Sequence, residues 1–292
     1  MKIPQTLEEQ IDSVIDLALT EDLGHGDITT ELLIPPDMQG NTSILVNEKG
    51  ILAGIKIAEK VFLRVDPSLS VEVIIQDGSR VQRGDIVATV SGTVASILKA
   101  ERIALNFLQR LSGIASETDK YISKTHDFTA DITDTRKTTP GLRLLEKYAV
   151  RMGGGKNHRL HLGDGILIKD NHLAALRAIG MGLKDIVAQA KKDIPQGMKI
   201  EVEVTSEPEA MIAAEAGADI IMLDNMNPEE MRHVLSLLPD RVKTEASGGI
   251  TLANVQAAAS TGVNLISVGA LTHSPKALNL SLELEPQTLR LL

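Results

Sequence analysis

The sequence predicts an α/β fold whose larger part is a (β/α) barrel. From about residue 129 onward, short apolar segments alternate with stretches of helical periodicity, a pattern typical of a parallel sheet whose strands are joined by helices. Glycine-containing turns at Gly217–Asp219 and Gly262–Asn264 are suited to lead from a helix into a strand. The repetition favours a closed barrel over an open sheet. We expect six strands, too few for a complete barrel, at residues 129–135, 165–168, 200–204, 220–223, 242–246 and 265–268.

Helices are expected between these strands, at residues 142–151, 173–192, 208–216, 228–238 and 252–261. Before them, a capping box at Thr6–Glu9 opens a helix through about Thr20. Residues 71–90 contain several hairpin signals, 100–111 are periodic as a helix, and Ser112–Gly113 is the expected domain boundary. Leucines alternate with other residues over 277–285, which predicts a final strand that returns to the N-terminal part.

The composition excludes several classes of function. Cysteine is absent, which excludes disulfides, thiolate catalysis and cysteine-ligated metals. A net charge of −9 with two Tyr, three Phe and no Trp argues against nucleic acid as a partner. The segment Met1–Glu9 has no apolar signal core, and no apolar run is long enough to span a membrane. We therefore expect a cytoplasmic protein.

One window of this acidic chain is strongly basic. Residues 136–172 contain eight Lys or Arg residues against three acids, together with His158, His161, His172 and the glycines Gly153–Gly155. A local excess of positive charge repels itself and usually has an anionic ligand to offset it. The window therefore predicts a pocket for a small, highly charged anion.

The expected strands end in polar residues of changing character, and ligands of barrels bind at these ends. The early ends carry cations, the middle ends carboxylates and the late ends glycines: residues 134–138, 169–171, 201–205, 224–225, 247–249 and 269–270. Glycines allow close approach to a phosphate, and Thr251 is a plausible cap of the helix that follows. Glu203 and Asp224 suit a divalent ion or sugar hydroxyls. The order predicts a site for a phosphorylated sugar and a carboxylate.

These residues closely resemble the nicotinate-nucleotide pyrophosphorylase (carboxylating) family, also called quinolinate phosphoribosyltransferases. The resemblance runs in order from about residue 21 to about 275. It rests on the motifs at Glu21–Thr29, Glu101–Asn106, Thr135–Arg143, Gly154–Arg159, Leu167–His172, Glu201–Val204, Leu223–Asn225, Ser247–Ile250 and Val268–Ala270.

The resemblance implies a reaction in de novo NAD biosynthesis. Quinolinate and phosphoribosyl pyrophosphate, with Mg²⁺, give nicotinate mononucleotide, pyrophosphate and CO₂. It also implies an N-terminal α/β sandwich (residues 1–112), an incomplete (β/α) barrel (113–275) and a C-terminal strand (276–292) that joins the sandwich. Members are homodimers or larger, and each active site takes an arginine from the neighbouring subunit.

The site residues follow from the matched motifs. Quinolinate binding carries over to Arg136, His158, Arg159 and Lys169, with Arg102 as the shared arginine. Lys137 lies between the two substrates, and Glu203 and Asp224 match residues near the ribose and the metal. The catalytic set is thus Lys137, Glu203 and Asp224. The phosphate side comprises Ser247, Gly248, Gly249, Gly269 and Ala270.

Several residues of the basic window have plainer interpretations. Arg143, Lys147 and Arg151 recur at helical spacing and are expected on a wet helix face or a phosphate-facing rim. Lys147 and Arg151 are interpreted as structural, and Arg143 is undecided. His158 and His161 lack a third ligand at a useful spacing, so a zinc pair is disfavoured. Glu201 is expected to pair with a buried cation such as Lys169.

Three other functions compete with this prediction. Residues 77–94 resemble the sheet of biotinyl and lipoyl carrier domains, but no lysine lies between Lys60 and Lys99 to carry the group. A related phosphoribosyltransferase for another aromatic acid, such as the homologues found beside molybdate transport genes, is the nearest alternative. A barrel that only binds a sugar phosphate would not need Arg136, Lys137, Arg159 and Lys169 together.

Overall fold

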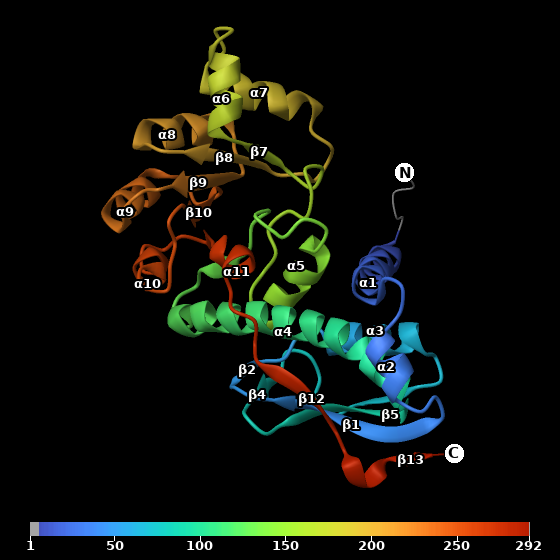
Figure 1. The fold of residues 1–292 in the computed structure, drawn as a ribbon. Coiled ribbons are helices and arrows are strands. Elements are labelled where there is room, and N and C mark those ends of the chain that lie inside the picture. The colour runs from blue at the N-terminus through green and yellow to red at the C-terminus, as the bar shows by residue number, and fades with distance from the viewer. Residues whose placement is uncertain (1–5, 292) are drawn as a thin grey trace. The chain divides into compact units, whose positions relative to one another are not determined.

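The computed structural model describes residues 6–291 and divides the chain into two compact units (Figure 1). The first unit comprises residues 1–119, 138–154 and 274–292, and the second comprises 120–137 and 155–273. No helix among the described residues is long and apolar enough to cross a membrane.

The first unit is built on an antiparallel sheet with strand order β12-β1-β5-β3, in which β13 also pairs with β1. These strands span Met38–Val46 (β1), Ser70–Val73 (β3), Ile86–Thr93 (β5), Leu280–Leu284 (β12) and Arg290–Leu291 (β13). A small ribbon pairs Gly50–Ile51 (β2) with Arg80–Val81 (β4). The helices are Leu7–Leu23 (α1), Ile28–Leu33 (α2), Ile55–Val65 (α3) and Arg143–Met152 (α5), with a 3₁₀ turn at Pro286–Thr288.

The helix predicted near the N-terminus and the strand predicted near the C-terminus both form. The capping box at Thr6 and Glu9 forms and begins α1, which continues three residues beyond Thr20 to Leu23. The leucine-alternating segment forms β12, which pairs antiparallel with β1 from Leu280↔Val46 to Leu284↔Thr42. The short helix α2, capped by Asp27, was not predicted.

Helix α4 is much longer than its predicted core. It runs from Val94 to Thr125, beyond the predicted stretch 100–111 at both ends, and it continues through Ser112 and Gly113. Ser112 bonds to the backbone of Ala53 through its hydroxyl group. Gly113 allows the carbonyl of Lys276 to lie so close that an added Cβ would come within 2.1 Å of it. These two small residues therefore permit close packing of the helix and do not terminate it.

The second unit is a six-stranded parallel sheet with strand order β6-β11-β10-β9-β8-β7. The strands are Asp131–Thr133 (β6), Ile166–Ile168 (β7), Ile200–Val204 (β8), Ile220–Asp224 (β9), Lys243–Ser247 (β10) and Leu265–Ser267 (β11). All six coincide with predicted strands. Because β6 and β7 do not pair, the barrel is incomplete. On its open side, Lys156 forms a parallel bridge with Thr133 of β6.

The intervening helices are Asp170–Arg177 (α6), Leu183–Asp193 (α7), Glu207–Ala216 (α8), Pro228–Leu237 (α9), Val255–Ala259 (α10) and Ala270–His273 (α11). The single helix predicted over 173–192 is wrong. Gly180 adopts a φ of +86°, which ends α6, and Gly182 begins α7 as its N-cap. Thr251 is not a helix cap either, because α10 begins only at Val255 after a turn.

The apolar core residues lie on one face of this sheet, and the polar residues of the pocket lie on the other face. Side chains alternate along each strand, so Val202, Ile221 and Ala246, all with no exposed surface, face away from the residues that line the barrel interior. Their neighbours Glu201, Glu203, Met222, Asp224, Glu245 and Ser247 share the interior face. The interior can therefore be polar without loss of the apolar core.

We predict that Gly113→Ala destabilises the protein by about 1–3 kcal/mol, because the new methyl group must displace the backbone at Lys276. Alanine otherwise favours a helix over glycine, so propensity alone predicts the opposite sign. Urea unfolding measures the change. The control is Gly165→Ala, where the added Cβ would meet only the Lys199 carbonyl at 3.9 Å. Unchanged stability of Gly113→Ala would contradict the close-packing interpretation.

Candidate active site

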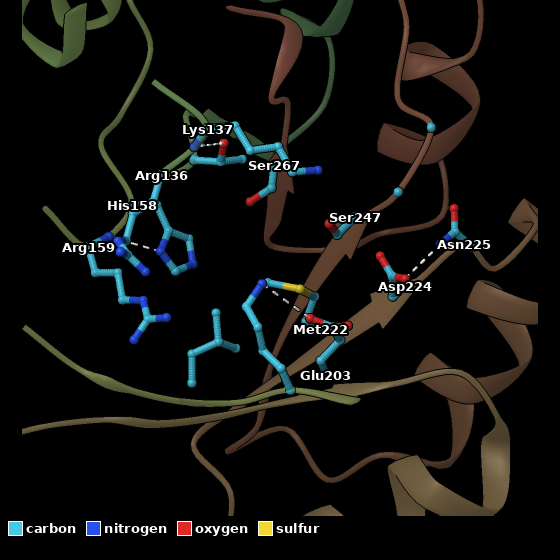
Figure 2. Close-up of a pocket in the computed structure, with 15 residues that line it drawn as sticks. Arg136, Lys137, His158, Arg159, Glu203, Met222, Asp224, Asn225, Ser247 and Ser267 are labelled. Atoms are coloured by element: carbon cyan, nitrogen blue, oxygen red, sulfur yellow. Dashed lines mark hydrogen bonds and ion pairs between the residues drawn. The ribbon is translucent and has the colours of Figure 1, made fainter. Parts of the chain in front are cut away.

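A pocket of about 510 Å³ lies at the carboxyl ends of the barrel strands (Figure 2). It is lined by Thr135, Arg136, Lys137, His158, Arg159, Leu167, Lys169, Glu203, Met222, Asp224, Asn225, Ser247, Gly248, Gly249 and Ser267. The structure thus brings together most of the predicted site residues, from both the basic window and the strand ends. All of them belong to the second unit.

Two cations follow β6 without charge partners among the described residues. Arg136 has a buried Nε that donates no hydrogen bond. The main chain at Lys137 is held from both sides: its N–H donates to the Thr135 hydroxyl at 3.0 Å, and its carbonyl accepts from the Thr272 hydroxyl at 2.8 Å. Gly269 leaves room for the Lys137 side chain, whose Cδ would lie 3.2 Å from an added Cβ. The fold therefore holds the backbone at Lys137, and it places no carboxylate against either cation in the described part of the chain.

His158 and Arg159 lie on a loop that is anchored by a buried carboxylate. Asp134 has no exposed surface, and it accepts from the His158 backbone N–H at 2.9 Å and the Asn157 amide at 2.6 Å. Arg159 donates to the Gly165 carbonyl at 3.0 Å. Burial, followed by the repulsion of Arg136, lowers the pKa of Arg159. That repulsion shows that the pocket holds positive charges close together.

The carboxylates of the pocket come from neighbouring strands, Glu203 from β8 and Asp224 from the end of β9. Lys169 Nζ lies 3.6 Å from Glu203. Burial raises the pKa of Glu203, Lys169 opposes this, and the charges of Asp224 and Asp170 add to it. Two facing carboxylates on one pocket wall offer hard oxygen donors of the kind Mg²⁺ prefers. The donor set fits that ion.

A glycine loop after β10 forms the part of the lining next to Asp224. Gly248 and Gly249 adopt φ angles of +84° and +61°, and Asn225, at +56°, is the sole non-glycine residue with positive φ in the described chain. The Asn225 N–H donates to the Ser247 carbonyl at 2.9 Å, and its amide bonds to Asp224 at 2.6 Å. A Cβ at Gly248 would lie 2.4 Å from the Asn225 Oδ1. Glycine is therefore required where these two loops meet.

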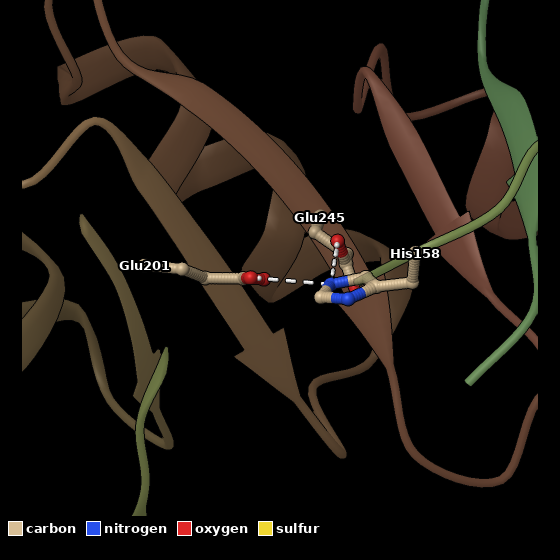
Figure 3. A group of neighbouring side chains, drawn as sticks. All are labelled: His158, Glu201 and Glu245. Atoms are coloured by element: carbon tan, nitrogen blue, oxygen red, sulfur yellow. Dashed lines mark ion pairs between the residues drawn. The ribbon is translucent and has the colours of Figure 1, made fainter. Parts of the chain in front are cut away.

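Below the pocket, His158 lies between two buried carboxylates (Figure 3). Its Nε2 is 3.1 Å from Glu201 and 3.4 Å from Glu245. The predicted partner of Glu201 was Lys169, which instead pairs with Glu203, because Glu201 lies one layer deeper on β8. Burial raises the pKa of Glu201, and the hydrogen bond and charge of His158 oppose this.

The same contacts control the protonation of His158. Burial lowers the pKa of His158, but the hydrogen bonds and charges of Glu201 and Glu245 outweigh it and raise that pKa to about 10. The Arg159 backbone N–H donates to Nδ1 at 2.8 Å, which leaves the ring proton on Nε2, facing the carboxylates. A fully charged ring must release that N–H, because a protonated Nδ1 cannot accept it.

Three predicted site residues do not line the pocket. Arg102 lies in the first unit on α4, where its side chain is 59% exposed and 4.0 Å from Glu101. Gly269 contacts Lys137 from behind, and Ala270 begins α11. Sequence reasoning in turn missed Met222, Ser267 and Glu245. The period-two alternation that placed Glu203 on the inner face could have found all three.

The remaining basic residues are partly structural. Lys147 is only 1% exposed, which contradicts a wet helix face but agrees with its interpretation as a structural residue. Arg151 is exposed and stacks over the Tyr148 ring at 5.7 Å, and Arg143 donates to the Thr138 hydroxyl at 3.0 Å. His161 pairs with Asp164 at 2.8 Å, away from the pocket lining.

Comparison with known proteins agrees with this geometry. The family models described as "Quinolinate phosphoribosyl transferase", N-terminal and C-terminal domains, match residues 27–112 and 114–283. A probable nicotinate-nucleotide pyrophosphorylase (carboxylating) of Bacillus subtilis is 43% identical over 274 residues, 94% of this chain and 93% of the relative. A mitochondrial quinolinate phosphoribosyltransferase (decarboxylating) of Nicotiana tabacum is 41% identical over 98% of this chain and 86% of its own length.

Solved structures give the same result. NadC from Streptococcus pyogenes superposes with a TM-score of 0.90 at 41% identity and covers 99% of this chain and 100% of its own. The nicotinate-nucleotide pyrophosphorylase of Francisella tularensis gives 0.89 at 38% identity, covering 97% and 98% of the two chains. With family models over both parts of the sequence and relatives above 40% identity over nearly its full length, the chain belongs to the quinolinate phosphoribosyltransferase family.

Proposed function

We propose that this protein converts quinolinate and phosphoribosyl pyrophosphate to nicotinate mononucleotide, pyrophosphate and CO₂, as a pentosyltransferase of NAD biosynthesis. One observation carries the proposal: the pocket presents Arg136 and Lys137 without charge partners among the described residues, opposite carboxylates and a glycine loop. A small aromatic dianion and a phosphorylated sugar together match this distribution of charge.

The cationic wall receives quinolinate in this proposal. Arg136 and Arg159 offer planar guanidinium groups suited to carboxylates, His158 adds a donor beside them, and Lys169 adds a cation next to Glu203. Ser247, Gly248 and Gly249 receive the ribose phosphate through backbone N–H groups, with Gly269 and Ala270 behind Lys137. Lys137, which extends between the two groups, contacts both substrates.

The first chemical step forms a glycosidic bond. The quinolinate ring nitrogen attacks C1 of the ribose while the bond from C1 to the pyrophosphate oxygen breaks, so positive charge develops on the sugar ring. Glu203 and Asp224 lie where they stabilise that charge. They would also hold Mg²⁺, which supplies positive charge to the departing pyrophosphate. The Asn225 amide holds the Asp224 carboxylate in place for this task.

The second step releases CO₂. The bond between the ring and the carboxylate next to the now-cationic nitrogen breaks, and its electron pair stays on the ring carbon until that carbon takes a proton. The ring charge stabilises this electron pair, and Lys137 or Lys169 adds to it by position. The mechanism is electrostatic and forms no covalent bond to the protein.

Turnover with quinolinate, phosphoribosyl pyrophosphate and Mg²⁺ tests the function. We expect nicotinate mononucleotide and CO₂ in equal amounts, no turnover of nicotinic acid, and loss of activity when a chelator removes the metal. Formation of nucleotide from another aromatic acid, with quinolinate inert, would favour the related transferase instead. Activity that survives chelation would remove Mg²⁺ from the proposal.

We predict that Lys137→Ala lowers kcat by about 100-fold or more, because the pocket loses the cation between the two substrates. The control is Lys156→Ala, also from the basic window but paired with Asp131 at 2.7 Å outside the pocket lining. Steady-state kinetics of both variants decide the matter. Equal effects of the two substitutions would contradict a specific role for Lys137.

We also propose a homodimer in which Arg102 serves the partner's active site, which suits its exposed position on α4. Arg102→Ala should fold normally and lose activity. Mixing it with Lys137→Ala should restore about a quarter of wild-type activity, because half of the dimers are mixed and each has one intact site. Verified mixed dimers without activity would exclude the sharing.

A further inference from the structure

Glu245 is a fully buried ionisable group near the pocket, and the proposed mechanism does not use it. It lies on β10, has no exposed surface, and points toward His158 and Glu201 (Figure 3). One carboxylate oxygen accepts a short hydrogen bond from the Ser267 hydroxyl, which also bonds to Thr133 at 3.0 Å. The other has no hydrogen bond and lies 3.4 Å from His158 Nε2.

This arrangement is unfavourable for stability alone. A carboxylate that leaves water loses its hydration, and an apolar or neutral group of similar size often makes a protein more stable at such a position. Here a second buried carboxylate, Glu201, faces the same ring and also leaves an oxygen without a hydrogen bond. One charged imidazole needs only one carboxylate as its charge partner, and His158 has two.

The geometry indicates instead that the two carboxylates hold the ring of His158 in one orientation. Glu201 on β8 and Glu245 on β10 approach Nε2 from two strands, while Asp134 anchors the His158 backbone. Strands are rigid supports for such contacts, whereas the loop that carries His158 is not. The ring therefore has a single orientation, with an edge in the pocket lining.

We propose that Glu245 is a positioning residue for the aromatic dicarboxylate: together with Glu201 it holds His158 where the ring meets the substrate carboxylate. This inference rests on the proposed function, which assigns His158 to quinolinate. Ser267 completes the arrangement, because its hydroxyl orients Glu245 and its side chain reaches the same pocket.

Glu245→Gln in the full chain tests the proposal, since it removes the charge at nearly constant volume. We expect KM for quinolinate, and its Kd measured without the second substrate, to rise by about tenfold. KM for phosphoribosyl pyrophosphate should stay within about twofold, and the melting temperature should be unchanged or higher. Glu245→Asp, which keeps the charge, should recover part of the affinity.

The matched control is Thr244→Val, the preceding residue of the same strand. Thr244 is also buried, but it faces the other side of the sheet and bonds to Asn264. This variant should melt at a lower temperature with both KM values unchanged. Ser267→Ala provides a second test that leaves the buried carboxylate in place, and it should raise KM for quinolinate by a smaller factor.

Three results would overturn the positioning role. Unchanged quinolinate affinity in folded Glu245→Gln would do so, and unchanged affinity in Ser267→Ala would do so if Glu245→Gln does not fold. Parallel loss of affinity for both substrates with a lowered melting temperature would show a structural role only. The proposed function fails separately: if the unmodified protein does not turn over quinolinate, both inferences fall, whereas turnover with an unaffected variant removes only this one.

Discussion

Repulsion among cations that must stay unpaired is the constraint on which the rest of this structure depends. A pocket for two anionic substrates needs positive charge on several sides, yet any carboxylate that paired with those cations would compete with the substrates. Arg136 and Lys137 accordingly lack charge partners among the described residues, and the charge of Arg136 disfavours the charged form of Arg159. The negative charge of the bound substrates must therefore offset the repulsion among these cations.

The chain resolves this conflict by bonding a buried acid to the backbone beside the cations. Asp134, which shortly precedes Arg136 and Lys137 in the sequence, accepts from the backbone N–H of His158 and from the Asn157 amide. This carboxylate fixes the path of the loop that carries His158 and Arg159, and it does not line the pocket. Negative charge thus orders this cation-bearing loop from outside the pocket lining.

The positions of the strands and the character of their ends could be predicted because both depend on local pattern. An apolar run followed by a polar residue is visible in sequence, and every one of the six barrel strands was found in this way. Contacts across the sheet could not be found. The partner of Glu201 depends on which layer of the barrel its side chain occupies, and His158 reaches it from another segment. The full length of α4 could not be found for a similar reason: Ser112 and Gly113 read locally as a break, but they are small because other segments pack closely against the helix there.

The incomplete barrel is part of how the site works. Since β6 and β7 do not pair, the chain from Gly155 to Gly165 can pass along the open side, where Lys156 bridges to Thr133. In a closed barrel only the strands contribute side chains to the interior. Every second residue of each strand points inward, and these side chains stack in regular layers. The opening admits a loop, and this loop delivers His158 and Arg159 at a depth between Glu201 and the strand ends. The opening of the barrel therefore allows His158 to reach the two carboxylates that orient its ring.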